Sequence, residues 1–165
     1  MVANSWRFHN PTAVIFEPGA LENLGQILPY ERAVLITIAS FRQQGVVDRV
    51  ASALGKKLVY VIDDVLPNPD LLTVDSQIKR LRPIHPDVII ALGGGSSIDT
   101  AKALAFMLMQ PIGSSLQSHF RNQKTLPENN ALPIIAIPTT SGTGSEVTPF
   151  ATIWDFELGK KYSVT

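Results

Sequence analysis

The residues best suited to chemistry lie in a glycine-rich turn, Gly93-Gly94-Gly95-Ser96-Ser97, between an apolar run and a helix-like segment. Glycines let backbone N–H groups approach a phosphate without a Cβ in the way. The first turn of a helix adds unpaired N–H donors and a partial positive charge. A tight turn with Ser96 or Ser97 as the helix N-cap is the alternative interpretation. Three consecutive glycines exceed what a cap needs, so the pattern favours phosphate binding, although its spacing is neither G-x-G-x-x-G nor a Walker A loop.

Two charged residues follow in the first turns of the expected helix. Asp99 is either a partner of the helix dipole or a hydrogen-bond acceptor for a ribose or amide of a bound cofactor. We expect Lys102 to be a solvated helix residue, with a phosphate contact as the less favoured interpretation.

A second polar loop, Pro138–Glu146, comes after another apolar run and interleaves small hydroxyl residues with glycine. This composition suits a pyrophosphate or a nicotinamide carboxamide, and it suits an ordinary flexible turn equally well. One dinucleotide that spans both loops is the economical explanation of the pair.

Both loops need regular elements to hold them, and apolar runs alternate with helix-like segments along the chain. The expected strands are Ala33–Ile38, Leu58–Ile62, Val88–Leu92 and Ile134–Ile137, and the expected helices are Leu21–Leu28, Phe41–Leu54, Leu71–Leu81 and Ile98–Met109. We expect Gly113–Asn130 to be an exposed loop. This order predicts an α/β fold with a doubly wound, mainly parallel, Rossmann-like sheet, in which both loops lie at the carboxyl ends of strands.

Composition excludes several classes of partner. The 165 residues fit one domain, and 45% apolar with 17% charged residues suits a sheet covered on both faces. A net charge of zero without a Lys/Arg cluster argues against nucleic acid and membrane as partners, and it leaves a homo-oligomer open. No cysteine is present, which excludes disulfides and thiolate metal sites. With no signal peptide and no apolar run of membrane-spanning length, we expect a cytoplasmic protein.

Three stretches together resemble the iron-containing (group III) alcohol dehydrogenase family: Pro67–Pro69, Gly93–Lys102 and Ile137–Thr148. The opening Pro11-Thr12 and Phe16–Ala20 are similar to the first hairpin of that family. Thr152–Asp155 and Lys160–Tyr162 are similar to the segment after its second loop. The resemblance implies an NAD(P)-dependent oxidoreductase that interconverts an alcohol and an aldehyde or ketone by hydride transfer. It further implies an N-terminal nucleotide-binding α/β domain and a C-terminal helical domain.

The resemblance also implies which residues contact the cofactor. Those at the pyrophosphate are Gly94, Gly95 and Ser96, with Asp99 at the nicotinamide half. The residues that line the rest of the cofactor cleft are Thr139, Thr140 and Ser145, with Asn68 near the adenosine ribose and Lys161 at the border.

The family holds Fe²⁺ or Zn²⁺ with an aspartate and three histidines of its C-terminal domain, so we expect no catalytic or metal-binding residue in this chain. His9, His85 and His119 are far apart in the sequence and lack carboxylate partners at ligand spacing, and we interpret them as structural.

The choice between NAD and NADP depends on the end of the first long strand. Family members that prefer NAD often carry an aspartate there, and the matching position is Ile38, followed by Ala39 and Ser40. No carboxylate repels a 2′-phosphate, Ser40 can donate to it, and Arg42 lies nearby in sequence. We therefore predict a preference for NADP.

We expect residues 1–165 to form a dinucleotide-binding domain that is truncated at its C-terminal end, lacks the helical domain and is inactive alone. Phe150, Ile153, Trp154 and Phe156 cluster near the end with no later segment to cover them. The alternative is a non-catalytic, free-standing nucleotide-binding module, which would close its own sheet edge.

Overall fold

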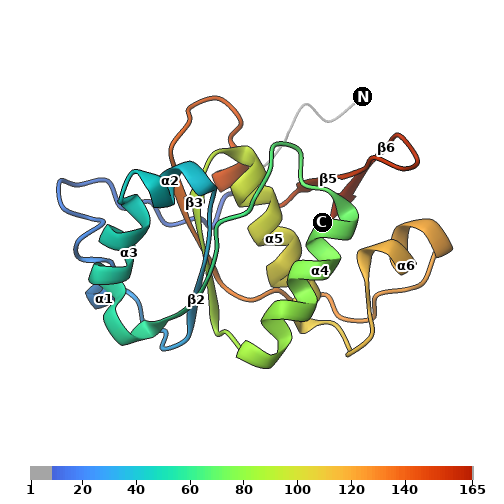
Figure 1. Cartoon of the computed structure of the whole chain (residues 1–165), viewed down its shortest axis with the longest axis horizontal. Helices are drawn as coiled ribbons and strands as arrows, with labels where there is room; N and C mark the ends of the chain where they lie inside the picture. Colours follow the sequence, from blue (N-terminus) through green and yellow to red (C-terminus); the bar gives the residue numbers. More distant parts are fainter. Residues whose placement is uncertain (1–8, 165) are drawn as a thin grey trace, which may run out of the picture.

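Four parallel strands form the centre of the structure, a computed structural model that describes residues 9–164 (Figure 1). The strand order is β2-β1-β3-β4, and the bounds are β1 Ala33–Ile36, β2 Leu58–Ile62, β3 Val88–Gly93 and β4 Ile134–Pro138. A separate antiparallel hairpin consists of β5 Ala151–Asp155 and β6 Lys160–Val164. The parallel sheet confirms the predicted fold class.

Helices cover both faces of the sheet (Figure 1). The helices are α1 Leu24–Ile27, α2 Ala39–Gln43, α3 Val46–Leu54, α4 Leu71–Leu81, α5 Gly95–Met109 and α6 Leu116–Asn122, with 3₁₀ turns η1 Gly55–Lys57, η2 Arg82–Ile84 and η3 Ser145–Val147. None of the helices within residues 9–164 is long and apolar enough to cross a membrane.

Successive side chains of the central strands enter opposite cores, because the side-chain period of a strand is two. In β1, Val34 and Ile36 join the core beneath α4 and α5, whereas Leu35 joins the core beneath α1 and α3. Every residue of β1 and β3 is buried. The continuous apolar runs in the sequence are therefore the signature of strands that are covered on both faces.

The carboxyl ends of β3 and β4 are aligned. Gly93 pairs in register with Pro138, and Thr139 N–H donates to Gly93 O at 3.0 Å, one residue beyond the strand. This alignment places the glycine-rich turn and the second polar loop side by side at one edge of the sheet.

Three predicted helices have wrong boundaries, and the one predicted over Leu21–Leu28 is confined to Leu24–Ile27. The helix predicted over Phe41–Leu54 is divided into α2 and α3 at Gly45, whose φ of +75° is left-handed. The helix predicted from Ile98 begins at Gly95, so the glycine turn supplies its first residues. The apolar pattern of the sequence does not reveal the break at Gly45, because apolar residues on both sides of it pack against the same core.

The prediction of a loop over Gly113–Asn130 was wrong, because this segment contains helix α6. The helix depends on a contact with a residue far away in the sequence. Ser115 caps the helix by accepting the Ser118 N–H at 3.0 Å, and Leu116 is fully buried. The buried carboxylate of Asp75 on α4 accepts the N–H groups of Leu116 at 2.7 Å and Gln117 at 3.0 Å. A partner 41 residues away thus satisfies the first turn of α6.

The apolar residues that the sequence leaves uncovered near residue 155 are partly covered in the structure. The hairpin β5–β6 packs on α5 and buries Ile153, while Trp154 is half-buried. Arg121 of α6 donates two bonds of 2.7 Å to Asp155 and ties α6 to the hairpin. Phe150 and Phe156 remain more than half exposed, so half of the expected apolar cluster is covered.

The expected first hairpin does not form within the described part of Pro11–Ala20. That segment has no strand, and Val14 and Phe16 are 78% and 99% exposed. The short apolar run has strand propensity but no strand partner among residues 9–164, and propensity alone does not make a strand.

Replacing Asp75 by alanine is expected to destabilise the protein by roughly 1–3 kcal/mol, because two amide donors of α6 lose their acceptor. Urea unfolding measures the loss of stability. Asp75→Asn keeps one acceptor oxygen and should lose less stability than Asp75→Ala. Ser76→Ala, at an exposed neighbouring position of α4, is the control. Equal stability of the Asp75→Ala and Ser76→Ala variants would contradict the proposed role of the carboxylate.

Candidate functional site

The glycine-rich turn leads from β3 directly into α5. Gly93 ends the strand and Gly94 is the N-cap residue in extended conformation. No side chain within residues 9–164 accepts a cap hydrogen bond there, so the alternative interpretation, with Ser96 or Ser97 as the N-cap, was wrong. The first N–H groups of α5 therefore need another acceptor.

The second polar loop packs directly against this turn. A Cβ on Gly94 would lie 2.8 Å from Thr140 Oγ1, and a Cβ on Gly95 would lie 3.0 Å from Thr143 Cγ2. At these separations a Cβ would require the side chains of Thr140 and Thr143 to shift. The glycines thus allow the close contact between the two loops, besides any role toward a ligand.

The turn at Pro67–Pro69 completes the edge. Asn68 N–H donates to Ser96 Oγ at 3.2 Å, with Asn68 in the left-handed region at a φ of +59°. Trp154 N–H donates to Pro69 O at 2.8 Å, which places the β5–β6 hairpin beside the same turn. Three segments far apart in the sequence therefore meet around Ser96 and Asn68.

Asp99 and Ser145, both predicted cofactor residues, contact each other. The Ser145 hydroxyl donates to Asp99 Oδ1, and Thr152 N–H donates to Asp99 Oδ2 at 3.1 Å. Ser145 is buried, whereas Asp99 is partly accessible. The pair joins α5 to the second loop and to β5.

Lys102 is not the solvated residue that the sequence suggested. Its side chain is only 13% exposed, and its ammonium donates to Ser145 Oγ, Thr148 Oγ1 and Phe150 O. Burial lowers the pKa of Lys102 below its ordinary value, against the opposing pull of the carboxylates of Asp99 and Glu146. Sequence reasoning could not reach this role, because the three acceptors lie 43 to 48 residues further along the chain.

The remaining predicted residues are accessible. Thr139 and Thr140 are exposed at the carboxyl end of β4. Lys161 lies on β6 with its ammonium 4.1 Å from the centre of the Trp154 ring, a cation–π contact. Thr143, which sequence reasoning did not single out, contributes by its fit against Gly95.

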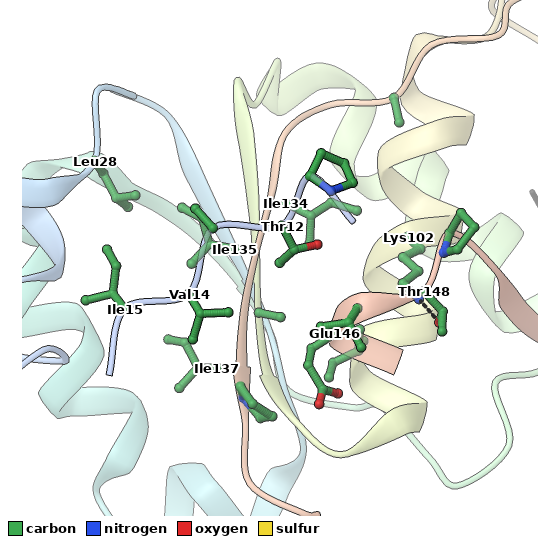
Figure 2. Close-up of a pocket in the computed structure, with 18 of the residues that line it drawn as sticks. Thr12, Val14, Ile15, Leu28, Lys102, Ile134, Ile135, Ile137, Glu146 and Thr148 are labelled. Atoms are coloured by element: carbon green, nitrogen blue, oxygen red, sulfur yellow. Dashed lines mark hydrogen bonds between the residues drawn. The ribbon is translucent and has the colours of Figure 1, made fainter. Parts of the chain in front are cut away.

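An apolar cavity of about 1090 Å³ extends along β4 (Figure 2). Ile135 and Ile137 of β4 line it together with Val14 and Ile15 of the N-terminal segment. Lys102, Glu146 and Thr148 lie together at one end of it. The glycine-rich turn does not line this cavity, so the two features are separate parts of the molecule.

A metal site does not occur within residues 9–164, where no three His, Asp or Glu side chains gather closely enough to hold an ion. The ring of His119 uses Nδ1 in a 2.8 Å contact with Lys124 O. His85 sits at a turn with a φ of +50°, where its carbonyl accepts from Arg32 at 3.0 Å, and His9 is exposed.

Comparison with known proteins gives a consistent result. Residues 11–165 match the family model "Iron-containing alcohol dehydrogenase". The chain is 36% identical to the aldehyde-alcohol dehydrogenase of Streptococcus pneumoniae, over 93% of this chain and 19% of that protein. It is 35% identical to the NADPH-dependent butanol dehydrogenase of Clostridium saccharobutylicum, over 94% of this chain and 40% of that protein.

A crystal structure of sulfoacetaldehyde reductase from Bifidobacterium kashiwanohense in complex with NAD⁺ superposes with a TM-score of 0.87 at 31% identity. The match covers 98% of this chain and 43% of the reductase. The chain therefore spans less than half the length of each of these relatives.

Gly94→Ala is expected to push the second loop away from α5, because the new Cβ meets Thr140 Oγ1. Hydrogen exchange of residues 139–147 should become faster than in the wild type. The double variant G94A/T140A should restore protection, since the Cβ of residue 140 would lie at an ordinary 3.7 Å. Unchanged exchange in the single variant would show that the loop does not depend on this contact.

Proposed function

Because the chain belongs to the iron-containing alcohol dehydrogenase family, we propose that residues 1–165 are the dinucleotide-binding domain of a metal-dependent alcohol dehydrogenase. The complete enzyme would interconvert a small alcohol and an aldehyde or ketone by hydride transfer. The observation that carries the proposal is the contact of the glycine-rich turn with the second polar loop at the carboxyl edge of a parallel sheet. A free-standing, non-catalytic module is not favoured, since the relatives are dehydrogenases and reductases.

The turn has the properties that a pyrophosphate requires. The first N–H groups of α5, including those of Gly95 and Ser96, have no side-chain cap within residues 9–164. Glycines 94 and 95 leave the backbone open to an anion, and the helix dipole favours negative charge there. Ser97 Oγ is buried in the same turn without a hydrogen-bond partner among the described residues. These groups fit a bound phosphate, and Asn68 borders them through Ser96.

The second loop is suited to the other half of the cofactor. When bound, the dinucleotide supplies the hydride donor or acceptor at its nicotinamide ring. The exposed hydroxyls of Thr139 and Thr140 can bind the carboxamide, with Lys161 at the border. Asp99 uses one bond on each oxygen, and because an ionised carboxylate has about four acceptor positions, it can also accept a carboxamide N–H. Ser145 holds Asp99 in place.

The metal does not fit this part of the chain, since the donors for Fe²⁺ or Zn²⁺ are missing from residues 9–164. Residues 9–164 would bind and orient the cofactor. We therefore propose that the chain alone is inactive and that metal and substrate are held by regions of the longer relatives that it does not span. Localisation in the cytoplasm and assembly into a homo-oligomer are further proposals.

A preference for NADP is supported by the end of β1, which lies next to the glycine turn because β1 pairs with β3. No carboxylate occurs at Ile38, Ala39 or Ser40 to accept a ribose 2′-hydroxyl. Arg42, one turn further on, forms an ion pair with Asp63 at the end of β2. A 2′-phosphate placed here would share the guanidinium of Arg42 with that aspartate.

The proposal is tested by titrating the chain with NADPH and NADH and following nicotinamide fluorescence. Gly95→Leu is expected to raise the Kd of both nucleotides at least about tenfold, ~1.4 kcal/mol, because the leucine side chain meets Thr143 and crowds the space between the second loop and the turn. Gln26→Leu, at an exposed position of α1, should leave binding unchanged. Absence of saturable binding by the folded wild-type chain would contradict the proposed function.

The cofactor preference has its own test in Arg42→Ala. This variant should weaken NADPH binding by about tenfold, ~1.4 kcal/mol, and leave NADH binding nearly unchanged. Asp63→Asn should strengthen NADPH binding, because it releases the guanidinium. Arg49→Ala removes an exposed arginine of α3 and serves as the control. Equal effects of Arg42→Ala on both nucleotides would argue against recognition of the 2′-phosphate.

A further inference from the structure

Lys102 is a buried positive charge that makes no contact assigned to the cofactor. It lies on α5, two turns from the glycine-rich turn, and its aliphatic chain borders the apolar cavity (Figure 2). Removing a lysine ammonium from water is costly unless its charge is paired and its donors are used. An apolar side chain would pack at this position without that cost, so the buried ammonium of Lys102 calls for an explanation in terms of its contacts.

The ammonium of Lys102 uses its full donor capacity on one short segment. It donates to Phe150 O at 2.7 Å, to Ser145 Oγ at 3.1 Å and to Thr148 Oγ1 at 3.3 Å. All three acceptors lie within residues 145–150, which connect the second polar loop to β5. Figure 2 shows the bond to Thr148 reaching across from α5.

Asp99 contacts the same segment from one turn earlier on α5. It accepts from the Ser145 hydroxyl and from Thr152 N–H, and it lies 3.9 Å from the Lys102 ammonium. Ser145 Oγ therefore accepts a hydrogen bond from Lys102, and its hydroxyl hydrogen points to Asp99 Oδ1. Each charge compensates the other, and together they hold residues 145–152 against the helix that carries the glycine turn.

We propose that Lys102 is a positioning residue that, through Ser145, Thr148 and Phe150, sets the second polar loop at the distance from the glycine turn that the nicotinamide half of the cofactor requires. This inference rests on the proposed function. It assigns Lys102 no contact with the cofactor. Loss of the ammonium releases the loop, whereas the glycine turn and the end of β1 keep their shape because β1, β3 and the core hold them.

Lys102→Met, which keeps the aliphatic chain and removes the charge, should therefore weaken binding of the nicotinamide half of the cofactor and leave binding of the adenosine and pyrophosphate half unchanged. The Kd of NADH is expected to rise about tenfold, and the emission of bound nicotinamide should approach that of the free nucleotide. The Kd of ADP, which carries only the adenosine and pyrophosphate half, should stay within about twofold of the wild type when measured by calorimetry. Lys56→Met, an exposed lysine at the opposite edge of the sheet, is the matched control.

Several outcomes would overturn the inference. Unchanged binding of NADH would do so, and so would an equal loss of NADH and ADP accompanied by a lower thermal midpoint, which indicates a purely structural role. Thr148→Val removes one acceptor at an exposed position and should raise the Kd of NADH about threefold in the same pattern, so it decides the matter if Lys102→Met fails to fold. A wild-type chain that binds neither NADH nor ADP would instead refute the proposed function itself.

Discussion

The arrangement of the candidate site depends on the in-register pairing of two parallel strands, β3 and β4. Their alignment ends in the bond from Thr139 N–H to Gly93 O, which brings the glycine-rich turn and the second polar loop into contact. Because parallel strands run in the same direction, their carboxyl ends lie at one edge of the sheet, and the crossover helices that connect them cover its faces. The polar groups that the core excludes are thereby concentrated where the strands end.

Helix α5 connects this edge to the rest of the molecule. Its first residues are glycines 94 and 95, whose missing side chains allow Thr140 and Thr143 to approach. Its next turns carry Asp99 and Lys102, which hold the segment after the second loop. The same helix thus offers free N–H donors at its start and opposite charges within reach of β5. The polar residues of α5 lie in its first half, where the helix borders the site, and the apolar residues of its second half are mostly buried in the core.

Local patterns predicted the parts of the fold that depend on local physics. The apolar runs at Leu58–Ile62 and Val88–Leu92 are strands as predicted, with Val88–Leu92 buried along its whole length, and Leu71–Leu81 is a helix that follows the cap residue Asp70 and ends before Pro83. The pattern failed where the deciding partner is remote. Helix α6 depends on Asp75, and the β5–β6 hairpin depends on packing against α5 and on Arg121. The division of Phe41–Leu54 came from the left-handed backbone of Gly45, which an apolar stripe conceals.

For the candidate site, the sequence by itself determined the chemical types. Glycines before a helix, hydroxyl residues after a strand and an aspartate in the first turns of the helix were all evident without coordinates, because these depend on residue type and neighbours alone. Only the tertiary structure decided which of them meet. It placed Thr140 against Gly94, joined Asn68 to Ser96, and buried Lys102 among acceptors that lie more than 40 residues away. The physical reason is that hydrogen bonds and close packing act between neighbours in space, and the pairing of parallel strands determines those neighbours only after the chain has folded.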